Sequence, residues 1–359
     1  MRKYCSISNA DGKTWVMPIV NMSMGMLLYQ PSGWKGKALK KFLPTLYPFH
    51  IVRRILHITY CDCPIKEDLK KQLESIFEES GLEYSWFGGT PNTHQKITIQ
   101  IFRGKHIYGY CKVTTSQYIY NIFQREQKFL NWMEEKGVGQ TPKCLYCGTG
   151  SNGSYIFVQT TVKTPTSLMH HEFGTMEMDF IRMFVRCTRH TQTYEESDLY
   201  TSVERMKQQL GKFDMTEHST INTLIQAIEK QYKKSSKYEF AAYHSDFTPW
   251  NMFVEKNELF VFDFEYAQYS SIPYLDIFHY IFQTMMFEKR SDAASIMNRL
   301  RRMKSTLQRF FDHYEVAIAA YLIDIIGFYA ERDKGFLDSQ QVIRLQVARL
   351  LAKQLISDI

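Results

Sequence analysis

One stretch near residue 250 carries acid, amide and imidazole side chains at fixed intervals. It contains His244, Asp246, Asn251 and Asp263, separated by two, five and twelve positions. A carboxylate can accept the proton of an attacking hydroxyl, and carboxylate and amide oxygens are ligands that Mg²⁺ prefers. Phosphoryl transfer requires both kinds of group. The spacing therefore indicates a site for this chemistry.

A predicted hairpin explains how these side chains could be positioned. The apolar runs Met252–Val254 and Leu259–Phe262 predict its two strands, with Glu255–Glu258 as the turn. Asp246 and Asn251 would then lie on the loop before the hairpin, with another carboxylate at its end. Singly, Asn and Asp are common turn residues. For the whole spaced set, coincidence is the weaker explanation.

This segment resembles the catalytic loop and metal-binding motif of aminoglycoside phosphotransferases and of choline and ethanolamine kinases, which share the protein-kinase fold. The family pattern His-x-Asp-x-x-x-x-Asn, an apolar strand and then Asp is present in full, and Asp263-Phe-Glu-Tyr-Ala is especially close to choline kinases. The resemblance covers roughly residues 81–285. It implies an α+β fold of two lobes, a small antiparallel sheet lobe and a larger, mainly helical lobe, with ATP and Mg²⁺ as cofactors.

The resemblance also implies a role for each matching residue. Asp246 would be the catalytic base, and Asn251 and Asp263 would hold Mg²⁺. His244 would buttress the loop. Asp276, which opens the next helix, would brace the loop from below, although such a residue could also simply cap its helix.

An upstream lysine and glutamate extend the resemblance. Lys112 lies near the end of the predicted strand His106–Thr114, and Glu126 lies on the following predicted helix in a context similar to the family's Glu-x-x-Phe-Leu pattern. Kinase folds pair such a lysine with a helix glutamate. Alternation along the strand predicts that Lys112 shares a face with Tyr108 and Tyr110. A surface lysine and a solvated glutamate are the ordinary alternative.

Further nucleotide contacts are predicted in two places. A Gly-Gly-Thr loop between two predicted strands could offer N–H groups and a hydroxyl to phosphates. It lacks the three spaced glycines of protein kinases and would, alone, be taken for a turn. The run Ile156–Thr161 would be the connector between the lobes and would hold adenine through its backbone groups. The candidate residues are Gly88, Gly89, Thr90, Gln159 and Thr161.

The order of predicted elements divides the chain into three sections. Residues 1–80 would be an N-terminal extension packed on the small lobe, with short strands at Trp15–Val20 and Gly25–Tyr29. Residues 81–161 would form the nucleotide-binding small lobe and its connector. Residues 162–359 would form the helical lobe, with the catalytic loop and the acceptor site.

Charge and hydropathy narrow the classes of partner. A net charge of +7 favours anionic partners such as nucleotides, phosphorylated substrates or an acidic membrane surface, but is too mild to indicate nucleic acid. The most apolar run, Val316–Ala330, is too short to span a membrane, contains Asp324 and predicts a core helix. The N-terminus lacks the apolar core of a signal peptide, so a cytoplasmic location is expected.

The seven cysteines are expected to be reduced thiols. A zinc site formed by Cys61, Cys63, Cys144 and Cys147 is a weaker alternative, because one pair precedes a helix and the other lies in a predicted strand.

Charged residues in two stretches of the helical lobe bear on the identity of the acceptor. Basic residues dominate the stretch 288–309, which favours an anionic acceptor such as a sugar nucleotide, a phosphorylated sugar or a lipid-linked glycan; a solvated helix face is the ordinary alternative. Acidic residues between 195 and 204 keep a cationic acceptor open, as in aminoglycoside kinases. A choline-type kinase would need an aromatic box with a carboxylate, for which Glu265 is the nearest candidate. A non-catalytic pseudokinase scaffold is the last alternative.

Overall fold

The computed structural model describes residues 3–9, 11–31, 33–89, 95–170, 172–335 and 337–357. The chain divides into two compact units. The first comprises Met1–Glu134, Gly139–Leu168 and Phe253–Glu265, and the second Glu135–Val138, Met169–Met252 and Tyr266–Ile359. The expected sections 1–80 and 81–161 thus lie together in the first unit. The hairpin after residue 252, expected within the third section, also belongs to the first unit.

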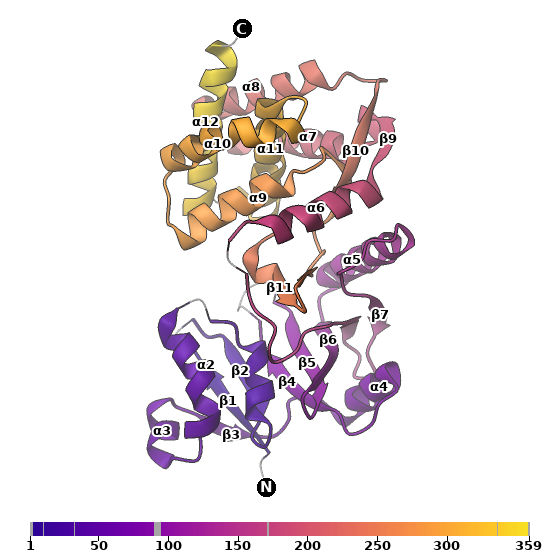
Figure 1. Cartoon of the computed structure of the whole chain (residues 1–359), viewed down its shortest axis with the longest axis vertical. Coiled ribbons are helices and arrows are strands. Elements are labelled where there is room, and N and C mark those ends of the chain that lie inside the picture. The colour runs from indigo at the N-terminus through magenta and orange to yellow at the C-terminus, as the bar shows by residue number, and fades with distance from the viewer. Residues whose placement is uncertain are drawn as a thin grey trace. The chain divides into compact units, whose positions relative to one another are not determined.

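The described part of the first unit contains one antiparallel sheet of eight strands, in the order β3-β1-β2-β4-β5-β6-β8-β7 (Figure 1). Its strands are β1 (Tyr4–Ser8), β2 (Thr14–Pro18), β3 (Thr59–Cys61), β4 (Glu83–Phe87), β5 (Ile97–Arg103), β6 (His106–Thr114), β7 (Cys144–Thr149) and β8 (Tyr155–Thr160). Because β2 pairs with β4, the N-terminal strands belong to the same sheet as the strands between residues 83 and 160.

The segment after β2 is helical, so the strand expected at Gly25–Tyr29 is wrong. It forms α1 (Met22–Gly25) and a single turn at Met26–Leu28. Gly25 packs directly on β2, where a Cβ would lie only 2.6 Å from the Cβ of Met17. This close approach lets the chain turn back across the sheet, which an apolar run alone does not reveal.

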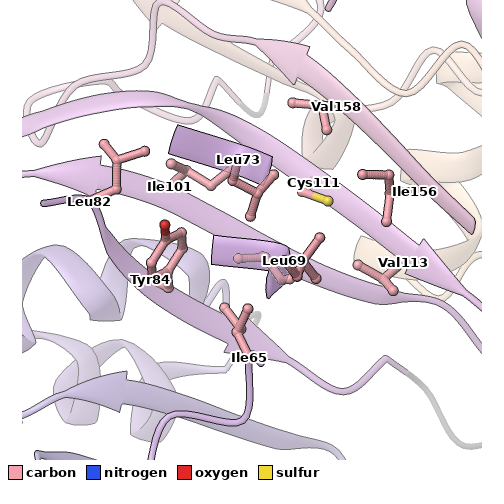
Figure 2. Packing of buried hydrophobic residues seen from close by; sticks show 11 residues of the cluster. Ile65, Leu69, Leu73, Leu82, Tyr84, Ile101, Cys111, Val113, Ile156 and Val158 are labelled. Atoms are coloured by element: carbon pink, nitrogen blue, oxygen red, sulfur yellow. The ribbon is translucent and has the colours of Figure 1, made fainter. Parts of the chain in front are cut away.

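Helices cover both faces of this sheet. Helix α4 (Glu67–Phe77) packs Leu69 and Leu73 onto one face, against buried side chains of β4, β5, β6 and β8 (Figure 2). The other face carries α2 (Trp34–Leu46), α3 (His50–Ile55) and α5 (Gln117–Glu135). Strand alternation explains this division. Trp86 of β4 packs in the cluster beneath α4, and it pairs with Val16 of β2. Met17, the next residue of β2, points to the opposite face and belongs to the cluster beneath α2.

A β-bulge changes one expected orientation on β6. The register with β5 shifts between Ile101 and Phe102, opposite Gly109 and Ile107. Tyr108 therefore faces α4, where its ring contacts Phe77 and its hydroxyl donates to Glu79. The expectation that Tyr108 shares the face of Lys112 is wrong, because the extra residue at the bulge reverses the alternation.

The second unit is mainly helical. Its long helices are α6 (Thr175–Thr188), α7 (Asp198–Gln209), α8 (Met215–Gln231), α9 (Asp276–Gln283), α10 (Ala293–Leu307), α11 (Tyr314–Arg332) and α12 (Ser339–Ser357), and a π-helical turn, Thr284–Glu288, follows α9. Helix α11 is buried along most of its length, as expected for a core helix. Its charged residue Asp324 accepts hydrogen bonds from Ser202 and Arg205, both at 2.6 Å. Within the described ranges, no helix is both long and apolar enough to cross a membrane.

Short strands lie beside the candidate site residues. In the second unit β10 (Lys237–Tyr243) pairs with β9 (His190–Thr193) and β13 (Gln268–Ser271). The expected hairpin is confirmed as β11 (Met252–Glu255) and β12 (Glu258–Val261). Its two turn residues, Lys256 and Asn257, have φ values of 51° and 64°, the left-handed pair that a tight two-residue hairpin requires.

Candidate functional site

Two lysines and three carboxylates meet in the first unit. We call this group the ion cluster; its members are Lys96, Lys112, Glu126, Asp263 and Glu265. Lys112 Nζ lies 2.7 Å from Glu126 Oε2 and 2.6 Å from Asp263 Oδ1. Lys96 Nζ donates to Glu265 and lies 3.8 Å from Asp263 Oδ1. Three carboxylates thus share two ammonium groups, which leaves the cluster with one formal negative charge.

Burial and crowding shift the proton affinities within the cluster. Glu126 is fully buried. Burial raises the pKa of Glu126 to about 7; Lys112 opposes the shift, and the carboxylates of Asp263 and Glu265 add to it. Burial lowers the pKa of Lys112, but Asp263 and Glu126 outweigh it and leave that pKa above its ordinary value. The lysine is therefore held charged, while burial disfavours the ionised form of Glu126.

Each member is brought to the cluster by a different element. Lys112 lies on β6 on the face covered by α5, and Glu126 lies on the buried side of α5. Asp263 follows β12 with a φ of 70°, a left-handed conformation that costs energy for a residue other than glycine. The next residue, Phe264, is buried and stacks on Phe129 of α5 at 5.8 Å. This stacking anchors the end of the hairpin to α5 and so presents Asp263 to Lys112.

The carboxylates of the ion cluster fit a hard divalent cation. Oxygens of Glu126, Asp263 and Glu265 lie within 4.8 Å of one another, and among the described residues this is the only such group of metal-ligand side chains. All-oxygen donor sets suit Mg²⁺ rather than zinc. The cysteines are free thiols, and none of them belongs to the metal-ligand group found among the described residues.

The second unit holds the loop around Asp246. Asn251 Nδ2 donates to Asp246 Oδ2 at 2.7 Å and to the Asp246 carbonyl at 3.0 Å. The Asp246 N–H donates to His244 Nδ1 at 3.2 Å, and His279 Nε2 of α9 lies 3.2 Å from Asp246 Oδ1. The carboxylate of Asp246 is thus held by two side chains, yet remains about one-third exposed. A carboxylate that is fixed but open to solvent suits proton acceptance.

Asp276 supports this loop from the start of α9. Its Oδ2 accepts the N–H of His244 at 3.1 Å, and both residues are buried. Burial raises the pKa of Asp276 to about 7, although hydrogen bonds from the N–H groups of His244 and Ser245 oppose the shift. Ser245 has a φ of 67°, so the loop is held in a strained conformation just before Asp246.

The described residues predicted to contact the nucleotide lie on several segments of the first unit. The Gly88 N–H donates to the Thr14 carbonyl at 3.0 Å, and Gly89 has a φ of 78° with no room for a Cβ beside the Lys96 carbonyl. Thr90 lies outside the described residues. Gln159 is buried at the end of β8, and the Thr161 hydroxyl accepts the N–H of Lys163 at 3.2 Å.

The structure brings the predicted residues together in two sets. Lys112, Glu126 and Asp263 meet in the first unit, and His244, Asp246, Asn251 and Asp276 meet in the second. Asn251 and Asp263, predicted as joint metal ligands, therefore belong to different units. Glu265, considered for a choline box, is paired with Lys96.

Sequence reasoning missed two residues of these sets. Lys96 precedes β5 and has its partner Glu265 169 positions away, so no local pattern marked it. His279 did carry a signal, because it lies three residues after Asp276 and hence on the same face of α9.

Comparison with known proteins identifies the fold. No protein-family model and no curated protein sequence matches the chain. Among solved structures, a thermostable mutant of aminoglycoside phosphotransferase APH(4)-Ia in complex with ADP and hygromycin B superposes with a TM-score of 0.54 at 10% identity, covering 79% of this chain and 97% of that one. A second mutant of that enzyme, with AMP-PNP and hygromycin B, gives 0.54 at 8% identity, covering 80% and 98%.

The structure of APH(4)-Ia itself gives a TM-score of 0.53 at 8% identity, with coverage of 80% and 98%. At such low identities the likeness concerns the fold. The expectation of a two-part α+β fold is confirmed, and the chain has the protein-kinase-like fold of the aminoglycoside phosphotransferases.

Proposed function

We propose that the protein is an ATP- and Mg²⁺-dependent phosphotransferase that moves the γ-phosphate of ATP to a hydroxyl group of a small molecule. One observation carries the proposal. The buried Lys112 ammonium lies between the helix carboxylate of Glu126 and the carboxylate of Asp263, which ends a hairpin. This arrangement supports the proposal because it matches the lysine, helix glutamate and metal-binding aspartate with which a kinase holds nucleotide phosphates and their metal.

A purely structural role explains the ion cluster poorly. Removing charged groups from water costs several kcal/mol for each ion, and apolar residues of similar size often stabilise a fold equally well. Asp263 adds the cost of a left-handed conformation. Strained backbone and shifted pKa values concentrate at functional sites, so a catalytic role accounts for features that stability alone does not.

The roles follow from the chemistry of the groups. Lys112 would hold the nucleotide phosphates, with Glu126 orienting it, and Asp263 and Asn251 would hold Mg²⁺. When bound, Mg²⁺ would neutralise charge on the phosphoryl oxygens. Asp246 would accept the proton of the attacking hydroxyl, since its carboxylate is both oriented and partly exposed.

Two of the similar structures support a nucleotide and a small acceptor. They hold ADP or AMP-PNP together with hygromycin B. In this chain only β13 and short connections separate Asp263 from Pro273. Such a segment is too short for the long activation loop with which protein kinases hold peptides. We therefore propose a sugar or glycan hydroxyl as the acceptor rather than a protein side chain.

A transfer assay with a matched substitution tests the proposal. The chain is incubated with γ-labelled ATP, Mg²⁺ and a panel of sugars, phosphorylated sugars, glycans, choline and aminoglycosides. We expect transfer to one class, and we expect Asp246→Asn to lose it by about a hundredfold or more while still binding ATP. Asp179→Asn, the same change at an exposed site on α6, should remain active.

Two results would overturn the assignment. If the wild-type chain binds no nucleotide with or without Mg²⁺, the kinase proposal is wrong. If it binds ATP but neither transfers phosphate to any member of the panel nor hydrolyses ATP, the chain is a non-catalytic scaffold. Near-normal turnover by Asp246→Asn would reject Asp246 as the base while leaving the kinase assignment in place.

A further inference from the structure

One stretch of the first unit contains several basic residues and no acidic residue. Residues 12–61 contain seven lysines and arginines and no aspartate or glutamate. Six of the seven lie on or next to the paired helices α2 (Trp34–Leu46) and α3 (His50–Ile55). A solvent-exposed stretch of this length usually carries both signs of charge, so the excess of positive charge requires a physical explanation.

The inner faces of α2 and α3 are already used by the fold. Leu43 and Tyr47 are buried, and Leu39, Val52 and Leu56 pack on the same hydrophobic cluster above β1 and β2. This packing fixes which sides of the two helices point away from the sheet. Among the described residues, the apolar side chains on the remaining sides of the two helices are not part of this cluster.

The outer faces of both helices carry large apolar side chains. Trp34 is 75% exposed, Phe42 51%, and Ile51 and Ile55 are each 70% exposed. Ile51 and Ile55 are four residues apart and so lie on one side of α3. We call these four residues, with the lysines between them, the α2–α3 surface. Exposed apolar side chains that are gathered together among polar residues are typical of interaction sites.

Lysines lie directly beside the exposed rings. Lys35 Nζ is 5.8 Å from the Trp34 ring centre, and Lys41 Nζ is 5.5 Å from that of Phe42. Lys37 and Arg54 are also exposed. Aromatic and branched apolar side chains interleaved with cations are the composition of helices that lie in the plane of a membrane interface.

We propose that the α2–α3 surface binds the surface of an anionic phospholipid bilayer. The tryptophan, phenylalanine and isoleucine side chains would enter the headgroup region, and the lysines would contact lipid phosphates. Charge complementarity favours this occupant. A second copy of the chain would bring an equally basic surface against this one, and like charges across an interface cost several kcal/mol. The proposal does not depend on the phosphotransferase activity.

Vesicle flotation of the full chain tests this inference. Vesicles of phosphatidylcholine alone are compared with vesicles that also contain phosphatidylglycerol, at low and at high salt. We expect binding only to the anionic vesicles, and we expect added salt to weaken it because it screens the lysines.

Two paired variants separate the apolar and charged contributions. Lys37→Gln with Lys41→Gln should weaken binding by about 25-fold, since each surface lysine contributes roughly fivefold. Ile51→Ser with Ile55→Ser should weaken it by about tenfold or more at unchanged charge. The control is Lys233→Gln with Lys234→Gln, which removes the same charge from an exposed turn of the second unit and should leave binding unchanged.

Each other outcome rejects the proposal. Equal loss in the control pair would show attraction by net charge alone. Absence of binding to anionic vesicles by the wild-type chain would exclude a bilayer as the occupant. A concentration-dependent dimer that Ile51→Ser with Ile55→Ser abolishes would assign the surface to a second copy instead. Unchanged urea midpoints of the variants confirm that each remains folded.

Discussion

Lys112 Nζ lies 2.6 Å from Asp263 Oδ1, although the two residues are 151 positions apart in the chain. The same nitrogen contacts Glu126 on α5 at 2.7 Å. One ammonium group thus joins β6, α5 and the end of the hairpin β11–β12. Substitution of Lys112 and substitution of Asp263 can therefore test the contact with nucleotide phosphates and the proposed metal site separately.

Removal of the Lys112 ammonium should impair the use of ATP. We expect Lys112→Ala to lower kcat/KM for ATP by about a hundredfold, the size of effect seen when one fixed charge donor is lost from an active site. Glu126→Gln should have a smaller effect, because Glu126 only orients the lysine. Lys105→Ala, at the exposed turn between β5 and β6, is the matched control. Unchanged kinetics for Lys112→Ala would remove it from the nucleotide site.

Asp263 should act through the metal. Calorimetric titration with ATP in the presence and absence of Mg²⁺ gives the increase in affinity that the metal provides. We expect Asp263→Ala to abolish this increase without weakening metal-free binding, since a carboxylate repels phosphate in the absence of a cation. Asp62→Ala, at an exposed position of the same unit, should behave as wild type. An undiminished Mg²⁺ effect in Asp263→Ala would contradict the ligand role.

Local patterns predicted much of this site. Alternation predicted the strand β6, and the resemblance to the kinase pattern predicted the Lys112–Glu126 pair. The hairpin β11–β12 followed from two apolar runs around a polar turn. These features depend on residues close in sequence or on the order of neighbouring elements, which the sequence displays directly.

Other features depend on contacts between distant residues. The pairing of β2 with β4 joins residues about seventy positions apart, and nothing near Trp15 marks its partner. Lys96 joins the ion cluster only because the end of the hairpin brings Glu265 to it. The bulge that turns Tyr108 towards α4 reflects a register shift between two strands, which the alternation of one strand cannot show.

Stability should depend on pH through Asp276. Burial raises the pKa of Asp276 from 3.8 to about 7, so between these values the folded chain keeps a proton that the unfolded chain has lost. This contribution to stability is complete below the lower value and is lost as the pH rises through about 7. Asp276→Asn retains an acceptor for the His244 N–H but cannot ionise.

Urea unfolding of wild type and Asp276→Asn across this pH range measures the effect. We expect the free energy of unfolding of the variant, relative to wild type, to increase with pH by up to about 1.4 kcal/mol per pH unit. Asp179→Asn, at an exposed site, serves as the control. A difference between Asp276→Asn and wild type that does not vary with pH would show that Asp276 is ionised throughout.

The basic face of α10 should contribute to the acceptor if the acceptor is anionic. Arg301 and Arg302 are exposed, and Arg301 lines an open hollow with Lys353 and Gln354 of α12. Arginine holds phosphate and carboxylate groups through paired N–H donors, so neutralising both arginines should raise the acceptor KM several-fold while the KM for ATP changes little. Arg301→Gln alone should account for most of the effect, because Arg302 does not line the hollow. Steady-state kinetics with the best acceptor of the panel measures both constants. Equal acceptor KM values in wild type and the double variant would mean that this face of α10 is only solvated. A preference for choline or a cationic antibiotic would reject an anionic acceptor while leaving the phosphotransferase assignment intact.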